Sequence, residues 1–328
     1  MTLKKSIPHS LCISRKKRGR GFQFYDENDE PISDPSLKKR LKELVIPPMW
    51  SDVKICKWDD GHIQAIGRDA KGRKQYIYHD KWEEARQKEK FDRMCSFGEE
   101  LPHLREIAHK FIHQKEWTRE KVISLLILIL DETGIRIGNK YYAEKNHTYG
   151  LTTLRRKHLH LESGSLLFEF KGKSNKMREV EINDEDLSKL IKKAAELPGY
   201  EIFRYKEGYG KYQEVDSDDV NEFIHHYLGE DYSSKDFRTW VASRLAIEYY
   251  PIALKQKEEF PRKKFTNLLI RYVADELGNT PTVCRSYYIH PQVMQKIENH
   301  NLNLKNYRDS KLDWGHSAVE KQLLDNIC

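Results

Sequence analysis

Hydrophobic and polar residues alternate in short runs through the first part of the chain, and turn residues separate these runs. A period of two is typical of strands that bury one face. Asp59-Asp60-Gly61 and Asp69-Ala70-Lys71-Gly72 supply the turns between the last three runs. The pattern predicts a short helix at Ser36–Leu44 and strands at Gly21–Tyr25, Val53–Trp58, His62–Gly67 and Arg73–His79. We therefore expect a small antiparallel sheet, preceded by a flexible basic terminus at residues 1–20.

From Asp80 onward the hydrophobic positions recur at helical spacing. Thr118 can cap a helix that runs to about Asp131, and Gly278 suits the end of another. Pro281 suits the first turn of a short helix. The further predicted helices are Asp184–Leu197, Asp216–Leu228, Lys235–Tyr250, Arg262–Leu277 and a polar tail at residues 292–328. Three strand-like runs interrupt them: His158–Glu162, Leu166–Lys171 and Arg178–Ile182.

A chain of 328 residues is long for one domain and favours two. The change from strand to helix patterns falls near residues 80–90. We predict an α+β protein with a small antiparallel β-rich domain at residues 1–85. A larger, mostly helical domain with a small three-stranded sheet would follow at residues 86–328.

The composition of the chain indicates what kind of molecule it could bind. The chain has 58 Lys and Arg against 51 Asp and Glu, which gives a net charge of +7. Such an excess suits a polyanion, although it is weak evidence alone. The basic cluster Arg15–Arg20 fits a solvated terminus or an arm that contacts phosphates. The longest apolar run, Val122–Leu130, is far shorter than the ~20 residues of a membrane helix, and no secretory signal precedes it, so we expect no membrane partner and a cytoplasmic protein.

Five scattered cysteines form no C-x-x-C pair, which favours a reducing compartment and argues against a disulfide framework or a zinc site. Asp26–Pro31 is similar to a calcium loop, but Pro31 stands where the required glycine would be. The sequence has no nucleotide-binding or metal-binding motif. We therefore expect neither a cofactor nor a metal.

The candidate chemistry centres on a pair of tyrosines, Tyr287 and Tyr288, near the end of the chain. A tyrosine hydroxyl can attack phosphorus and hold it as an ester if cations stabilise the charge on the phosphate. Three earlier stretches can supply cations: Gly134–Gly138, Lys171–Ser174 and Lys235–Thr239. The sequence alone does not show that these stretches converge.

These stretches, in this order, resemble those of the bacterial and poxvirus-type DNA topoisomerases of class IB. The similarity extends from about Gly21 to Pro291 and is carried by three motifs: Lys235-Asp236-Phe237-Arg238-Thr239, Leu277-Gly278-Asn279-Thr280-Pro281 and Ser286-Tyr287-Tyr288-Ile289-His290-Pro291. The resemblance implies the fold shared by these enzymes and the tyrosine recombinases. It also implies a monomeric two-domain clamp around duplex DNA that relaxes supercoils through a 3′-phosphotyrosyl link, without ATP or metal.

The resemblance also assigns site residues. Tyr288, directly before Ile-His-Pro, would be the nucleophile, with Tyr287 as the alternative. Arg136 and Arg238 would stabilise charge on the phosphate. Lys173 would donate a proton to the departing 5′-oxygen, with Lys171 and Lys176 as competing candidates. Asn279 stands where related enzymes carry histidine or asparagine, and it can offer a neutral hydrogen bond.

In poxvirus-type enzymes, the glutamine and tyrosines that match Gln75, Tyr76 and Tyr78 meet DNA in the major groove. Lys235 is a further candidate for DNA binding. The alternative interpretation of Gln75–Tyr78 is the ordinary alternation of a sheet.

Two other functions remain open at this point. A tyrosine recombinase uses similar chemistry, but it typically has His-x-x-Arg where this chain has Lys235 three residues before Arg238. A non-catalytic DNA-binding protein of the same fold would not need the full set of Arg136, Lys173, Arg238 and Tyr288.

Overall fold

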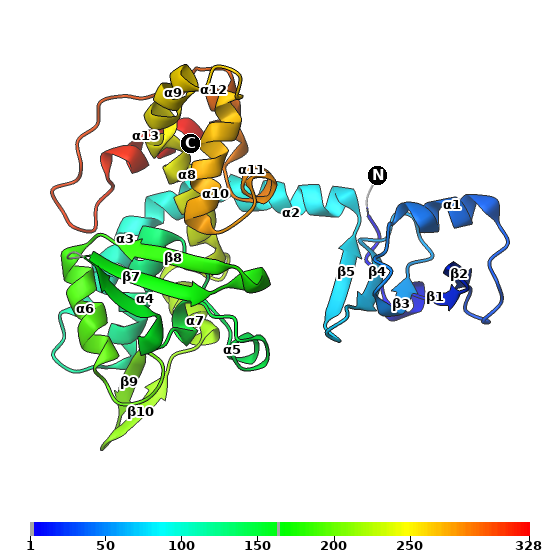
Figure 1. Cartoon of the computed structure of the whole chain (residues 1–328), viewed down its shortest axis with the longest axis horizontal. Coiled ribbons are helices and arrows are strands. Elements are labelled where there is room, and N and C mark those ends of the chain that lie inside the picture. The colour runs from blue at the N-terminus through cyan, green and yellow to red at the C-terminus, as the bar shows by residue number, and fades with distance from the viewer. Residues whose placement is uncertain (1–2, 163–164) are drawn as a thin grey trace. The chain divides into compact units, whose positions relative to one another are not determined.

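The computed structural model describes residues 3–162 and 165–328 (Figure 1). The chain forms two compact units, Met1–Lys90 and Phe91–Cys328, and the boundary between them along the chain falls within helix α2 (Asp80–Asp92). The expected α+β class is confirmed, with an antiparallel N-terminal sheet, a helical second unit and a small three-stranded sheet. In the part of the chain that is described, none of the helices has the length and apolar character that crossing a bilayer requires.

The first unit is an antiparallel sheet with the strand order β2-β1-β3-β4-β5. Ile13 pairs with Ile55 across β1 and β3, and both side chains are buried with Phe24 and Leu41. Leu41 lies on helix α1 (Pro35–Glu43), which begins at the capping side chain of Asp34. The strands are β1 (Ile13–Arg18), β2 (Gly21–Tyr25), β3 (Ser51–Ile55), β4 (Ile63–Arg68) and β5 (Lys74–Tyr78).

The prediction of a flexible terminus at residues 1–20 is wrong for β1, while Met1 and Thr2 lie outside the described residues. Most of β1 is charged, so it lacks the apolar alternation that marks a strand. Its backbone is held by β2 and β3 on either side. Arg15 donates hydrogen bonds to the carbonyls of Ile46, Pro47 and Trp50 at 2.7, 2.9 and 3.0 Å. This arginine of the basic cluster therefore holds the fold together.

The second unit is mostly helical. Its helices after α2 are α3 (Met94–Ile112), α4 (Arg119–Thr133), α5 (Lys140–Asn146), α6 (Glu185–Ala195), α7 (Ser217–Leu228), α8 (Ser234–Glu248), α9 (Tyr250–Glu259), α10 (Phe265–Leu277), α11 (Pro281–Tyr287), α12 (Pro291–Glu298) and α13 (Ala318–Ile327). Its strands are β6 (Leu159–Glu162), β7 (Ser165–Lys171), β8 (Met177–Ile182), β9 (Arg204–Glu207) and β10 (Lys211–Glu214). β6, β7 and β8 form the antiparallel three-stranded sheet, and β9 and β10 form a separate hairpin.

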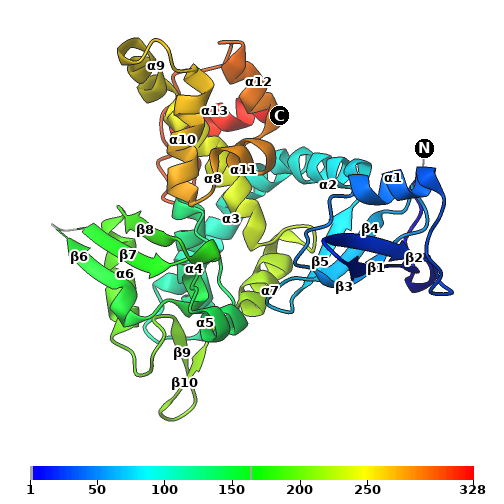
Figure 2. The ribbon, with the colours of Figure 1, turned by 45° about the vertical axis from the view of Figure 1, so that its right-hand side comes forward.

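Helix α4 is the centre of this unit (Figure 2). Its apolar residues point in all directions, which is the pattern of a helix surrounded by protein, and Val122–Leu130 is buried almost throughout. Helices α3, α6, α7 and α8 pack against it, and strand β8 lies beside it. Its C-terminal end is therefore held rigidly in the core.

A buried ionic network joins four of these helices. Arg105 on α3 donates to Asp131 on α4 at 2.6 and 3.0 Å, and to Glu320 on α13. The indole nitrogen of Trp240 on α8 donates to the same Glu320 at 3.1 Å. Glu320 is only 1% exposed. The network fixes the C-terminal helix to the elements that carry the candidate site.

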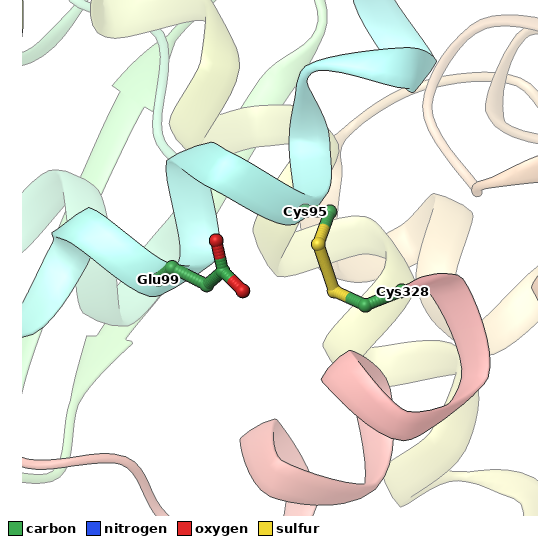
Figure 3. A group of neighbouring side chains, drawn as sticks. All are labelled: Cys95, Glu99 and Cys328. Carbon is green, nitrogen blue, oxygen red and sulfur yellow. A yellow bond between two sulfur atoms is a disulfide. The ribbon is translucent and has the colours of Figure 1, made fainter.

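The structure contains a disulfide, which the expectation of a reducing compartment did not foresee. Cys95 on α3 is bonded to Cys328 after α13, although 233 positions separate them in sequence (Figure 3). The spacing of cysteines along a chain does not report which helices pack together, and here α13 lies against α3. Glu99 lies beside the pair. Because each sulfur is bonded to the other, neither is a thiolate that could bind a metal.

Candidate active site

Arg136 follows the end of α4. Gly134 ends that helix in the left-handed region with φ 59°, and a Cβ there would lie 2.9 Å from a methyl of Leu277. The Arg136 guanidinium then reaches the carbonyl of Gly278 at 3.4 Å and forms a short hydrogen bond to Oδ1 of Asn279. Burial, with the charge of Arg238, lowers the pKa of Arg136 to about 10. The side chain is therefore still cationic at neutral pH.

Arg238 comes from the first turns of α8, and only 5% of it is exposed. Its Nη1 donates to the carbonyl of Gly134, and its Nη2 donates to that of Leu277 at 3.0 Å. The guanidinium carbon lies 5.1 Å from the centre of the Tyr288 ring. Burial lowers the pKa of Arg238, and the neighbouring Tyr288 and Cys284 side chains oppose that effect. Arg238 thus joins the ends of α4 and α10 to the tyrosine.

Tyr288 lies at the C-terminal end of α11, which Thr280 caps and Pro281 begins. Its N–H donates to the carbonyl of Cys284 at 3.0 Å, and its half-buried ring packs against the core. Tyr287, one residue earlier, is 42% exposed. This difference favours Tyr288 over Tyr287 as the residue at the site.

Two residues that sequence reasoning did not assign hold the segment that follows Tyr288. Ser243 on α8 accepts from the His290 N–H at 2.9 Å, and its Oγ donates to the Thr239 carbonyl at 3.0 Å, with the Tyr288 carbonyl 3.5 Å away. The His290 ring accepts from Gln292 N–H at the start of α12, and its Nε2 lies 3.3 Å from the Phe91 carbonyl. His290 belongs to the Ser286–Pro291 motif, so the sequence had already singled out its position. Ser243 lies within α8 outside any of the motifs, so the sequence gave no indication of its role.

Lys173 lies in the turn η4 (Lys173–Asn175) between β7 and β8. It lines the same small cavity as Arg136 and Arg238. Lys171 and Lys176, also exposed, are not among the described residues that line that cavity. A turn of the three-stranded sheet therefore places Lys173 at the cavity that Arg136 and Arg238 line.

Asn279 follows Gly278 at the end of α10, and its N–H donates to the Ala274 carbonyl at 2.9 Å. Its Oδ1 accepts from Arg136, and its side chain is a neighbour of the buried thiol of Cys284. Burial raises the pKa of Cys284 to about 11, although Asn279 and the two arginines act in the opposite direction. Cys284 therefore remains a neutral thiol, and it is not a competing nucleophile.

The candidate DNA-binding residues belong to both units. Gln75, Tyr76 and Tyr78 are on β5 of the first unit, and Lys235 is exposed at the start of α8 in the second. Tyr76 and Tyr78 share one face, with ring centres 5.8 Å apart. Gln75 donates to Asp69 at 3.0 Å. A stacked, partly exposed tyrosine pair is a surface that can meet a nucleic acid.

Comparison with known protein families shows which family the chain belongs to. Residues 79–313 match the catalytic core of eukaryotic DNA topoisomerase I, and residues 21–69 match the N-terminal domain of bacterial DNA topoisomerase IB. The chain therefore belongs to the type IB DNA topoisomerases and is an enzyme of that family.

Named relatives are similar over most of their length. DNA topoisomerase 1B of Acanthamoeba polyphaga mimivirus is 29% identical over 88% of each chain. DNA topoisomerase 1B of vaccinia virus (strain Copenhagen) is 26% identical over 86% of this chain and 89% of its own. Among solved structures, the XerH site-specific recombinase bound to its difH substrate has a TM-score of 0.38 and 20% identity, over 62% of this chain and 52% of its own.

Proposed function

We propose that the chain relaxes supercoiled duplex DNA by cutting and rejoining one strand through Tyr288. The single observation that carries this proposal is that Arg136, Lys173 and Arg238 line one small cavity, with Asn279 bonded to Arg136 and the Tyr288 ring beside Arg238. These five residues come from five separate segments of the second unit. Such a set of fixed cations suits a phosphate on which negative charge develops.

In the proposed step, the Tyr288 oxygen attacks a backbone phosphorus and loses its proton to solvent. The new phosphorus–oxygen bond gives a 3′-phosphotyrosyl link, and the bond to the 5′-oxygen breaks. Arg136 and Arg238 stabilise the non-bridging oxygens, and Asn279 adds a hydrogen bond. Lys173 supplies the proton to the departing 5′-oxygen.

The cut strand then rotates about the intact strand, and the 5′-hydroxyl attacks the phosphotyrosine to reverse the step. One phosphodiester is exchanged for another ester, so the energy of the bond is retained. We therefore expect neither ATP nor a metal to be needed. The binding partner is double-stranded DNA, met by a monomer in the cytoplasm, with Gln75, Tyr76, Tyr78 and Lys235 as further contacts.

Supercoiled plasmid, incubated with the protein in EDTA and without ATP, tests the proposal. We expect relaxation of both positive and negative supercoils. Recombinant products at paired sites without relaxation would indicate a recombinase instead. DNA binding without any strand breakage would indicate a non-catalytic DNA-binding protein.

A further inference from the structure

Arg178, the second residue of β8, connects the three-stranded sheet to the end of helix α10. Its Nη1 donates to the carbonyl of Asp275 at 2.9 Å, and its Nη2 donates to the carbonyl of Glu276 at 2.5 Å. Carbonyls in the last turn of a helix have no partner within the helix, and they attract positive charge. One side chain therefore fastens the sheet to the turn that leads into Asn279.

The same side chain fills the space over two glycines. A Cβ added at Gly278 would lie 2.3 Å from the guanidinium carbon of Arg178, and one at Gly172 would lie 2.8 Å from its Cγ. Gly172 has φ −93°, which other residues adopt readily, so it is space rather than backbone conformation that excludes a side chain there. Gly172 directly precedes Lys173, and Gly278 directly precedes Asn279. Arg178 thus lies between the two turns that carry these site residues.

Arg178 also lines the cavity shared by Arg136, Lys173 and Arg238. Burial, together with the positive charge of Arg238, lowers the pKa of Arg178. Both of its terminal nitrogens already donate to protein carbonyls. Arg238 also donates to two carbonyls, so the contacts with Gly172 and Gly278 are what distinguish Arg178 as a residue that holds the site together.

We propose that Arg178 is a positioning residue that clamps the Lys173 turn to the Asn279 turn. The clamp brings the proton donor and the amide donor to one phosphate together. The inference rests on the proposed function, because it takes Lys173 and Asn279 as parts of the reaction site. A displacement of about 1 Å at such groups can cost about a hundredfold in rate.

A double-mutant cycle tests the clamp in the full-length protein. Single-turnover cleavage of a duplex oligonucleotide is measured for Arg178→Ala, Asn279→Ala and the double variant, and then for the same cycle with Lys173→Ala. We expect Arg178→Ala to slow cleavage about tenfold to a hundredfold. Because a clamp acts through its neighbours, each double variant should lose clearly less than the product of the two single losses.

Two further variants separate positioning from other roles. Gly172→Ala should slow cleavage in the wild-type background and cost nothing in the Arg178→Ala background, where the added methyl has room. The matched control is Arg156→Ala, which removes an exposed arginine that also donates to a backbone carbonyl just after a helix, that of Leu197 after α6. This control should cleave at the wild-type rate. Noncovalent DNA affinity, measured with Tyr288→Phe present, should be unchanged by Arg178→Ala.

Three results would overturn the clamp: wild-type cleavage by Arg178→Ala, fully multiplicative losses in both cycles, or a weakening of DNA affinity that accounts for the whole effect. If Arg178→Ala fails to fold, the test rests on Gly172→Ala in the wild-type background. Cleavage at the wild-type rate by Gly172→Ala would then overturn the clamp. Failure of the proposed function is separate, because it would appear as relaxation by Tyr288→Phe whatever Arg178 does.

Discussion

The guanidinium carbon of Arg238 lies 5.1 Å from the centre of the Tyr288 ring, although the two residues come from different helices. Arg238 is held by carbonyls at the ends of α4 and α10. The Tyr288 N–H donates to the Cys284 carbonyl, and the N–H of His290, two residues on, donates to Ser243. Both partners are therefore positioned by buried elements before any phosphate arrives, which is the arrangement that lowers the cost of organising a transition state.

Tyr288→Phe removes the attacking oxygen and keeps the ring beside Arg238. We expect relaxation of supercoiled plasmid to be abolished, while DNA binding in a gel-shift assay stays at the wild-type level. The matched control is Tyr287→Phe, which changes the exposed neighbour and should relax DNA normally. A covalent DNA adduct formed by Tyr288→Phe and mapped to Tyr287 would identify Tyr287 as the nucleophile.

Glu320→Ala should destabilise the second unit strongly. The variant leaves Arg105 and the Trp240 N–H buried without one of their acceptors. Removal of one partner of a buried ion pair costs about 3–5 kcal/mol. Denaturant unfolding measures this loss, and Asp186→Asn, which breaks an exposed pair with Lys189, should leave the midpoint unchanged. A loss no greater than that of the control would contradict the role given to the network.

The same network predicts a dependence on pH. Burial raises the pKa of Glu320, but the His316 ring, 3.8 Å away, and Arg105 outweigh it and hold the pKa well below its usual range. A depressed carboxyl pKa stabilises the fold above the unfolded value of about 4.3, and this contribution is lost as the pH falls below it. The difference in stability between wild type and Glu320→Gln should therefore shrink on acidification below about pH 4.

Local sequence patterns predicted much of the fold. The three-stranded sheet was expected at His158–Glu162, Leu166–Lys171 and Arg178–Ile182, and β6, β7 and β8 differ from these by one residue at their starts. Alternation marks these strands because one face is buried. The hairpin of β9 and β10, like β1, consists mainly of charged and polar residues. These strands form by backbone pairing with a neighbouring strand and not by burying an apolar face, so the hydrophobic pattern did not predict them.

The candidate site was predictable only in part. The resemblance supplied Arg136, Lys173, Arg238, Asn279 and Tyr288 as separate positions, and these roles remain proposals. Their convergence depends on which helix ends meet, and that is a property of tertiary packing. Arg178 and Ser243 act through backbone carbonyls and N–H groups of distant segments, so no local pattern marks them.

The Cys95–Cys328 bond predicts a difference between oxidised and reduced protein. A cross-link restricts the unfolded chain, and such bonds typically contribute about 2–4 kcal/mol. We expect reductant to lower the melting temperature of the wild type, and Cys328→Ser to melt like the reduced wild type with or without reductant. Cys12→Ser is the control and should keep the response. Denatured, unreduced protein should titrate three thiols, and five would show that the bond does not form.

Lys173 gives the most discriminating prediction about the reaction. A general acid matters only while the leaving oxygen needs a proton, and it typically contributes about 10²–10⁴-fold. Lys173→Ala should therefore cleave ordinary DNA far more slowly than wild type in single-turnover measurements. On DNA with sulfur at the 5′-bridging position, most of that loss should vanish, because a thiolate departs without a proton.

Arg136→Ala is the matched comparison, because its proposed partners are the non-bridging oxygens. Its loss, about 10²–10³-fold for one such donor, should be similar on both substrates, since sulfur at the bridge does not replace a cation beside those oxygens. Rescue of both variants alike would mean that sulfur merely accelerates any impaired enzyme. No rescue of Lys173→Ala would assign the proton donor elsewhere. Lys171→Ala and Lys176→Ala would then be tested on the same two substrates, because these lysines flank the same turn.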